Sequence, residues 1–190
     1  TASADDASYA TLYLPYDVTT SDDVQAYIIT SVGDDAAQTT LIGQDIPAET
    51  PVILRSESNL AFCRITACPS ASATTTGNLI QGTTSEINGA TDCYVLNIMA
   101  DGENANKACF YKLSNEGVLA ANHAYLPSSA VTTSSGVKAI VLRWGDEDGI
   151  DSARQDTLPT DDTIYDLSGR RIQKPTRGLY IQNGKKMVVR

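Results

Sequence analysis

Four cysteines and one histidine are the side chains best suited to nucleophilic chemistry. The thiols are Cys63, Cys68, Cys93 and Cys109, and His123 is the sole histidine. A Cys–His pair would require one of these thiols beside His123, because an adjacent base activates the thiol. His123 follows Asn122 where we expect a strand to begin, so a polar residue at a turn is the simpler interpretation. The sequence contains no Gly-x-Ser-x-Gly elbow, phosphate-binding glycine loop or His-Glu-x-x-His motif. We therefore expect no catalytic residues and no enzyme activity.

The cysteines could instead be structural. An even number of cysteines in an extracellular chain favours disulfides. We prefer the pair Cys93–Cys109, which would join two strands of one hairpin, and Cys63–Cys68 could close a tight turn. Cross-sheet pairings and buried free thiols remain as alternatives. A structural zinc site needs close ligand pairs such as Cys-x2-Cys, which the Cys63-x4-Cys68 spacing does not provide.

Two oxygen-rich loops could bind calcium. They span residues 101–106 and 146–151, but neither matches the twelve-residue helix-flanked calcium loop with its terminal Glu. We expect both to be ordinary solvated turns, so the sequence predicts no metal site and no cofactor.

Aromatic residues suggest one binding mode. An exposed row of planar side chains could stack on sugar rings, and alternation places Tyr9 and Tyr13 on one face of the first strand. Trp144, near the end of the strand-rich region, is a third candidate for stacking. However, the chain has only two Phe, so Tyr must also fill the core. The aromatic residues on expected strands are Tyr9, Tyr13, Tyr27, Tyr94, Tyr111, Tyr125 and Trp144.

The elements that would position these residues are strands. Short runs rich in Val, Ile, Tyr and Thr, separated by Gly, Asn, Asp, Ser and Pro, are typical of β-structure. The sequence predicts an all-β fold, an antiparallel β-sandwich of roughly nine to twelve strands, with a small C-terminal two-hairpin sheet. The expected strands of the sandwich are 10–16, 24–30, 39–42, 51–55, 60–65, 93–99, 108–113, 123–126 and 137–142.

Charge divides the chain into parts. Residues 163–190 carry seven of the 14 Lys and Arg against one acid, or +6, whereas residues 1–162 carry −15. We expect a β-sandwich module at 1–145, an acidic linker at 146–162 and a hairpin tail at 163–190. A net charge of −9 argues against nucleic acid as the main partner. The sequence has no run of 18 apolar residues, so we expect no membrane span. Because it begins at Thr1, we expect a processed product or a part of a longer polypeptide.

Turn signals predict the structure of the tail. Asn183-Gly184 lies between 179–181 and 187–189, and Asn-Gly suits the positive φ angles of a two-residue type I′ turn. Ser168-Gly169 lies similarly between 164–167 and 170–172. Pro175 cannot donate to a ladder and belongs between the two hairpins.

These tail residues also carry a family resemblance. Residues 164–171 (Ile-Tyr-Asp-Leu-Ser-Gly-Arg-Arg), the Gly-Leu-Tyr at 178–180 and the basic end resemble the type IX (Por) secretion sorting domain of secreted Bacteroidetes proteins. The loop at 173–177 is shorter than in the full sorting domain, so a truncated relative that serves as a folding cap is an alternative. The matching positions are Tyr165, Asp166, Leu167, Gly169, Arg170, Gly178, Tyr180, Gly184, Lys185 and Lys186.

A less specific resemblance covers most of residues 7–143. The segments 9–16, 24–27, 46–54 and 120–126 are similar to a β-rich module that follows the main domains of Bacteroidetes surface proteins. The resemblance implies a non-catalytic accessory module of a secreted or surface protein, extracellular or associated with the outer membrane. Its expected partners are other domains of a larger polypeptide, and secretion machinery or surface glycan. The alternative is a carbohydrate- or adhesin-type binding module that uses exposed aromatic residues.

Overall fold

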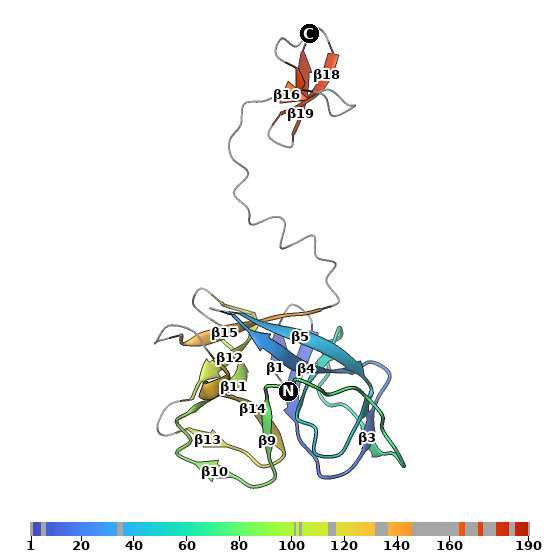
Figure 1. The fold of residues 1–190 in the computed structure, drawn as a ribbon, viewed down its shortest axis with the longest axis vertical. Helices are drawn as coiled ribbons and strands as arrows, with labels where there is room; N and C mark the ends of the chain where they lie inside the picture. The colour runs from blue at the N-terminus through green and yellow to red at the C-terminus, as the bar shows by residue number, and fades with distance from the viewer. Residues whose placement is uncertain are drawn as a thin grey trace. The chain divides into compact units, whose positions relative to one another are not determined.

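The protein forms two compact units, residues 1–146 and 147–190, in the computed structural model (Figure 1). The structure describes residues 2–4, 7–33, 36–100, 102, 104–113, 117–131 and 137–145, and the strand residues 164–165, 171–172, 178–182 and 185–189. The described chain is built of strands, which confirms the predicted all-β class. No helix among the described residues is long and apolar enough to cross a membrane.

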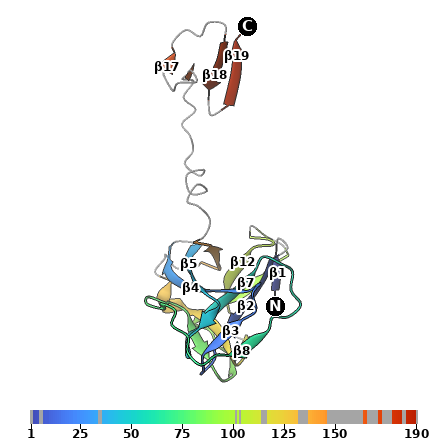
Figure 2. The same ribbon diagram turned by 90° about the vertical axis from the view of Figure 1, so that its right-hand side faces the viewer.

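Unit 1 is built around one ten-stranded sheet. Neighbouring strands in it follow the order β1-β2-β7-β4-β5-β15-β12-β11-β14-β9, and Figure 2 shows β2, β4 and β7 side by side. The strands are β1 (Ala2–Ala4), β2 (Ala7–Leu12), β7 (Val52–Ser56), β4 (Gln25–Val32), β5 (Ala36–Gly43), β15 (Ala139–Arg143), β12 (Ala108–Lys112), β11 (Cys93–Ile98), β14 (His123–Pro127) and β9 (Gln81–Thr83).

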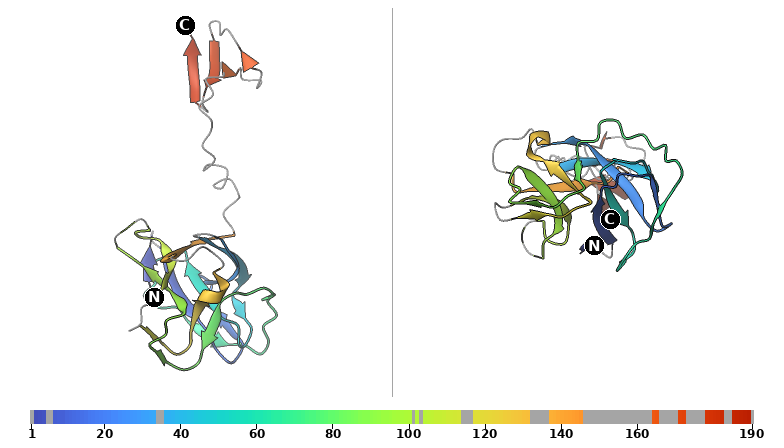
Figure 3. Two further views of the ribbon diagram at one scale, coloured as in Figure 1. Left: turned by 60° about the vertical axis from the view of Figure 1, so that its left-hand side comes forward. Right: turned by 90° about the horizontal axis from the view of Figure 1, so that it is seen from below.

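The long sheet curls on itself and encloses the main core. The strands β2 and β14 are far apart in the strand order of the sheet. Nevertheless, the amide of Tyr13, just after β2, donates to the carbonyl of Asn122, just before β14, at 3.0 Å. The early strands, in blue, and the later ones, in yellow and green, lie on opposite sides of the unit (Figure 3, right). We call the cluster between them core 1; it joins Tyr9 and Ile53 of the early strands to Phe110 and Leu126 of the late ones.

A second layer covers the outer face of the early strands. A three-stranded sheet, ordered β6-β3-β8, consists of β3 (Val18–Thr20), β6 (Asp45–Ile46) and β8 (Ile65–Ala67). Core 2 lies beneath this layer and includes Val18, Ala26, Ile28, Val52 and Leu54. Since Ile53 of β7 faces core 1 and its neighbours Val52 and Leu54 face core 2, the early strands are buried on both faces.

Two details of the predicted sandwich are wrong. First, β15 pairs with β5 in parallel, with Val141 opposite Ala36, so the large sheet is mixed rather than antiparallel. Second, residues 60–64 form no strand. The Ser8 hydroxyl accepts from the Leu60 amide at 2.7 Å and donates to the Leu60 carbonyl at 3.3 Å. These hydrogen bonds to a side chain take the place of pairing with a neighbouring strand. Two remaining short strands, β10 (Ile87–Asn88) and β13 (Val118–Leu119), pair with each other.

Unit 2 contains the predicted two-hairpin sheet. Its order is β17-β16-β18-β19, from β16 (Ile164–Tyr165), β17 (Arg171–Ile172), β18 (Gly178–Gln182) and β19 (Lys185–Val189) (Figure 2). All three pairings are antiparallel, and β16–β18 joins the two hairpins into one sheet.

The last hairpin supports a prediction about its turn. Gln182 pairs with Lys185, so two residues, 183 and 184, connect the strands; both lie outside the described residues. A type I′ turn requires positive φ at both positions, which a β-branched residue strongly disfavours. We expect Gly184→Val to cost about 1–3 kcal/mol in this hairpin and to expose the amides of 179–189 to hydrogen exchange, while those of unit 1 stay protected. Lys185→Ala is the control, with an expected change of about 0.5 kcal/mol or less. Unchanged protection in Gly184→Val would contradict the proposed turn.

Candidate functional site

The three candidate stacking residues do not form an exposed platform. Tyr9 is only 7% exposed and belongs to core 1. The Trp144 ring stacks on it, with 5.5 Å between ring centroids and 24° between planes. Tyr13, half-buried, covers Gly82 so closely that a Cβ there would lie 2.0 Å from its ring. Tyr9 therefore cannot present a ring face to a sugar, and Trp144 uses one face to pack against Tyr9.

Arg55 and two tyrosines hold Trp144 at the end of core 1. Arg55 lies opposite Tyr9 on one side and Gln25 on the other. Its guanidinium carbon lies 4.6 Å from the centroid of the Trp144 ring, a cation–π distance. Tyr27 meets the same ring edge-on at 5.0 Å. Arg55 Nη2 also pairs with Glu57 at 2.9 Å, whereas its buried Nε has no hydrogen-bond partner in the described structure.

A polar cavity of about 270 Å³ opens beside Arg55. Its lining includes three carboxylates and one guanidinium, and that guanidinium already pairs with Glu57 and lies over Trp144. In the described part of the chain, no group of three or more His, Cys, Asp or Glu is arranged to hold a metal ion. The cavity lining is Asp22, Asp23, Gln25, Tyr27, Arg55, Glu57 and Ser58.

All four cysteines, each a described residue, are free thiols in the structure. The preferred pairing Cys93–Cys109 is wrong in register: Cys109 lies opposite Asn97, four residues along β11 from Cys93. Four residues of strand span about 13 Å, whereas bridged cysteines have Cα atoms at most about 7 Å apart. Cys63 and Cys68 are half-buried thiols that lie before and after β8, respectively.

Burial makes two of these thiols poor nucleophiles. Burial raises the pKa of Cys93 above its ordinary value, and the negative charge of Asp92 raises it further. Burial also raises the pKa of Cys109, against smaller opposing effects of a hydrogen bond with Tyr111 and the charge of Lys107. Because the thiolate is the reactive species, both groups stay protonated and unreactive at neutral pH.

A labelling experiment tests this placement of the thiols. We expect iodoacetamide at neutral pH to modify Cys63 and Cys68 in the folded protein, and Cys93 and Cys109 only after unfolding in denaturant. Peptide mass mapping after timed labelling distinguishes the two classes. Equal labelling rates for all four cysteines in the folded protein would contradict the structure.

His123 contacts a threonine hydroxyl rather than a thiol in the described structure. Its Nδ1 lies 3.0 Å from the hydroxyl of Thr11, and it pairs across the ladder with Thr83. On β14 it lies four residues from Pro127, the residue opposite Cys93. The structure therefore brings His123 to a threonine at the junction of β2 and β14. A hollow of about 230 Å³ borders this junction and is lined by Thr11, Val95, Leu96, Val118, Leu119, Ala120, His123 and Ala124.

The expected solvated loops are described only in part. Within 101–106, residues 102 and 104–106 are described and form a turn in which Ala105 donates to the carbonyl of Gly102 at 3.1 Å. Residues 146–151 lie outside the described residues.

The sorting-like motif maps partly onto the strands of unit 2. Tyr165 on β16 lies between Arg171 and Ile181 of the flanking strands. Gly178 and Tyr180 lie on β18, opposite Val189 and Met187 of β19. Lys185 and Lys186 begin β19. The motif positions Asp166, Leu167, Gly169, Arg170 and Gly184 lie outside the described residues.

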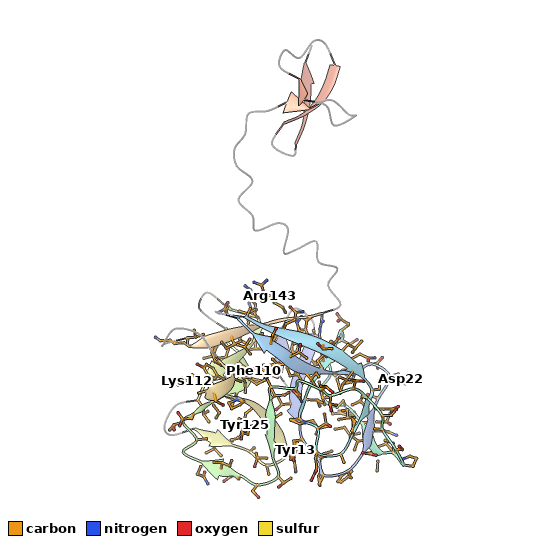
Figure 4. All side chains as sticks on the ribbon, in the orientation of Figure 1. Tyr13, Asp22, Phe110, Lys112, Tyr125 and Arg143 are labelled. Carbon is orange, nitrogen blue, oxygen red and sulfur yellow. The ribbon has the colours of Figure 1, made fainter. Side chains whose placement is uncertain are left out.

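A second tyrosine pair lies on the outer face of the late strands. Tyr111 on β12 pairs with Ala139 of β15 and with Val95 of β11. Cys93 and Tyr94 of β11 pair with Pro127 and Leu126 of β14, where the ladder between these two strands ends. Tyr125, which is labelled in Figure 4, pairs with Gln81 of β9.

Tyr111 and Tyr125 lie on the faces of their strands that point away from core 1. Tyr94 and Leu96, the neighbours of Val95 on β11, belong to core 1 or pack against it, as do Phe110 and Leu126. The sequence placed Tyr111 and Tyr125 on strands but gave no reason to prefer them to Tyr9 and Tyr13. Alternation was only a partial signal: Tyr125 lies between the buried residues Ala124 and Leu126, whereas Tyr111 lies between buried Phe110 and exposed Lys112.

Comparison of the chain with protein-family models, with curated proteins and with solved structures gave no match.

Proposed function

We propose that the protein is a non-catalytic accessory module of a secreted or cell-surface protein, and that residues 163–190 act as a sorting or anchoring segment. The observation that carries the proposal is the arrangement of the tail residues. Its motif residues Tyr165, Gly178 and Tyr180 stand on the strands of a small four-stranded sheet that belongs to its own compact unit. The +6 charge of this segment contrasts with the −15 of residues 1–162.

The physical properties of unit 2 suit such a role. The strands of this antiparallel sheet lie close together in the sequence, and such local contacts favour rapid folding. A segment of this kind is suited to recognition as a unit. Machinery that reads a basic final strand would find Lys185 and Lys186 at the start of β19. The proposal places the protein outside the cell or at the outer membrane, with other domains of a larger polypeptide as its neighbours.

Unit 1 suits the role of a spacer or display module. Its early strands are buried on both faces, between core 1 and core 2. Burial of apolar side chains stabilises a fold by roughly 25 cal/mol per Å² of apolar area removed from water. A unit of about 140 residues is large enough to bury a substantial core in this way. Such a body tolerates an attached segment without a change in its own core.

Removal of the tail tests both parts of the proposal. We expect residues 1–162 alone to keep the melting temperature of unit 1 within about 2 °C, because none of core 1 or core 2 is lost. In a Bacteroidetes host with type IX secretion, we expect the truncated chain to remain inside the cell envelope while the full chain reaches the surface. Surface protease digestion and cell fractionation report the location.

Two results would contradict the proposal. Equal surface display of the two chains would show that the tail does not direct export. A large fall in the melting temperature on truncation would instead assign residues 163–190 the role of a folding cap.

A further inference from the structure

The hollow of about 230 Å³ beside His123 lies where strands β11 and β14 separate. Their ladder ends at Tyr94 and Leu126, and the first residues of β14 pair with β9 instead. Val95 and Leu96, the next residues of β11, both line the hollow. Because successive side chains of a strand point to opposite faces, a hollow lined by both of them lies along the edge of β11. The divergence of the two strands therefore accounts for its position.

The lining of the hollow is largely apolar and contains no Asp, Glu, Lys or Arg. In a chain with 14 basic and 23 acidic residues, such a lining disfavours charged ligands, which would lose hydration without gaining an opposite charge. Val118 is 52% exposed, so part of this apolar surface is open to solvent. An uncharged ligand with an apolar body suits the hollow best. The apolar lining residues are Val95, Leu96, Val118, Leu119, Ala120 and Ala124.

Thr11 and His123 are the two polar residues of the lining. Buried Thr11 holds the imidazole ring through a contact of 3.0 Å between its hydroxyl and Nδ1. Nε2 of the exposed His123 has no hydrogen-bond partner among the described residues. This nitrogen donates in one neutral tautomer of the ring and accepts in the other. A ligand hydroxyl can do both, so it pairs with Nε2 in either tautomer.

The volume of the hollow limits the ligand to a small molecule. An apolar cavity of about 150 Å³ holds one benzene molecule, and sites for drug-sized ligands begin at about 300 Å³. A hollow of about 230 Å³ thus matches one six-membered ring that carries a short alkyl group and a hydroxyl. Because exposed residues form part of the lining, such a ligand is only partly buried, and we expect a Kd of about 1 mM.

We propose that the hollow is a binding site for small neutral molecules that carry one hydroxyl on an apolar ring, such as alkylphenols. The ring packs against Val95, Leu96 and Val118, and the hydroxyl pairs with Nε2 of His123. The site lies wholly within unit 1, so it does not depend on the export role of residues 163–190.

The sole histidine of the chain provides a direct test, because the imidazole C–H groups of His123 give one set of NMR signals. The full chain is titrated with para-cresol, with toluene, which lacks the hydroxyl, and with 4-methylbenzoate, which is charged. We expect para-cresol to shift the imidazole signals saturably. Toluene should bind about five-fold more weakly, as the loss of one hydrogen bond predicts, and 4-methylbenzoate about ten-fold more weakly.

Two neighbouring alanines provide a matched pair of variants. Both are exposed, but Ala120 lines the hollow and Ala121 does not. We expect Ala120→Trp to fill the hollow and to weaken para-cresol binding about ten-fold or more, whereas Ala121→Trp should bind as wild type. A second variant, Val118→Asn, changes an exposed side chain of the lining and should weaken binding about three-fold. Dispersed amide spectra confirm that each variant is folded.

A further variant tests the role of the imidazole. In His123→Ala, binding is followed through the ligand signals by saturation-transfer NMR, and the preference for para-cresol over toluene should disappear. The proposal is overturned if para-cresol causes no saturable shift, or if toluene or 4-methylbenzoate binds as tightly as para-cresol. It is also overturned if Ala120→Trp and Val118→Asn bind as wild type, or if His123→Ala retains the preference for para-cresol.

Discussion

Replacing Phe110 with alanine is expected to lower the unfolding free energy of unit 1 by about 3–5 kcal/mol, the usual cost of removing a buried phenylalanine. Phe110 is completely buried, lies on β12 near the centre of the large sheet, and packs in core 1 with residues from both halves (Figure 4). The cavity left by its ring cannot close easily, because the strands on both sides of core 1 are hydrogen-bonded into one sheet and cannot move toward each other independently. Urea denaturation followed by tryptophan fluorescence measures the change, since Trp144 packs against the same core.

The chain provides its own control for this substitution. Phe62, the only other phenylalanine, is 81% exposed in the segment after β7. We expect Phe62→Ala to change the unfolding free energy by about 0.5 kcal/mol or less. Similar losses for the two substitutions would contradict the assignment of core 1.

Loss of the Asp17 carboxylate is expected to cost about 2–4 kcal/mol. Its two oxygens accept the backbone amides of Ala48 at 2.6 Å and Ala71 at 3.1 Å, and its carbonyl accepts the amide of Cys68 at 3.0 Å. Hydrogen bonds to a charged group contribute about 1.5–3 kcal/mol each when they are removed. Asp17→Ala leaves both side-chain-bound amides without a partner and should loosen the layer formed by β3, β6 and β8.

Denaturation and hydrogen exchange together test the role of Asp17. We expect Asp17→Ala to lower the unfolding free energy and to expose the amides of Ala48 and Ala71. Asp22→Ala, at an exposed turn between β3 and β4, should stay within about 0.5 kcal/mol of wild type. If the two Asp variants behave alike, Asp17 does not organise these loops.

Local signals located the strands of unit 2 but gave the register only of its last hairpin, since Tyr165 pairs with Arg171 and five residues rather than two separate β16 from β17. Asn183-Gly184 and Ser168-Gly169 mark two connections, and a tight turn fixes the register of the strands that it joins. The structure pairs Gln182 with Lys185, as a two-residue connection requires. Alternating strand patterns likewise located most strands of unit 1.

The arrangement of strands in unit 1 depends on contacts that no local pattern encodes. The parallel pair β5–β15 joins Ala36 to Val141, more than 100 residues apart. The long connection between β11 and β12 does not fix a register, so the expected match of Cys93 with Cys109 was wrong by four residues. At 60–65, apolar residues suggested a strand, but the Ser8 hydroxyl binds the backbone of Leu60 instead.

Burial on two faces explains the misplaced stacking residues. Where one face of a strand is wet, apolar and polar residues alternate and exposure can be predicted. On β2 and β7 both faces are buried, so Tyr9 carried no sign that it faces core 1. The late strands also gave little indication of which tyrosines are exposed. Tyr111 and Tyr125 are only half-buried, and the buried thiols Cys93 and Cys109 lie on the same face as these tyrosines.

A reporter fusion tests the central claim, that residues 163–190 are a separable sorting segment. Residues 147–190 are fused to the C-terminus of a periplasmic fluorescent reporter and expressed in a Bacteroidetes host with type IX secretion, and surface exposure is measured by protease accessibility in intact cells. The proposed function predicts that the fused reporter becomes accessible and that Gly184→Val in the fusion reduces this. A fused reporter that stays as protected as the unfused one would contradict the claim.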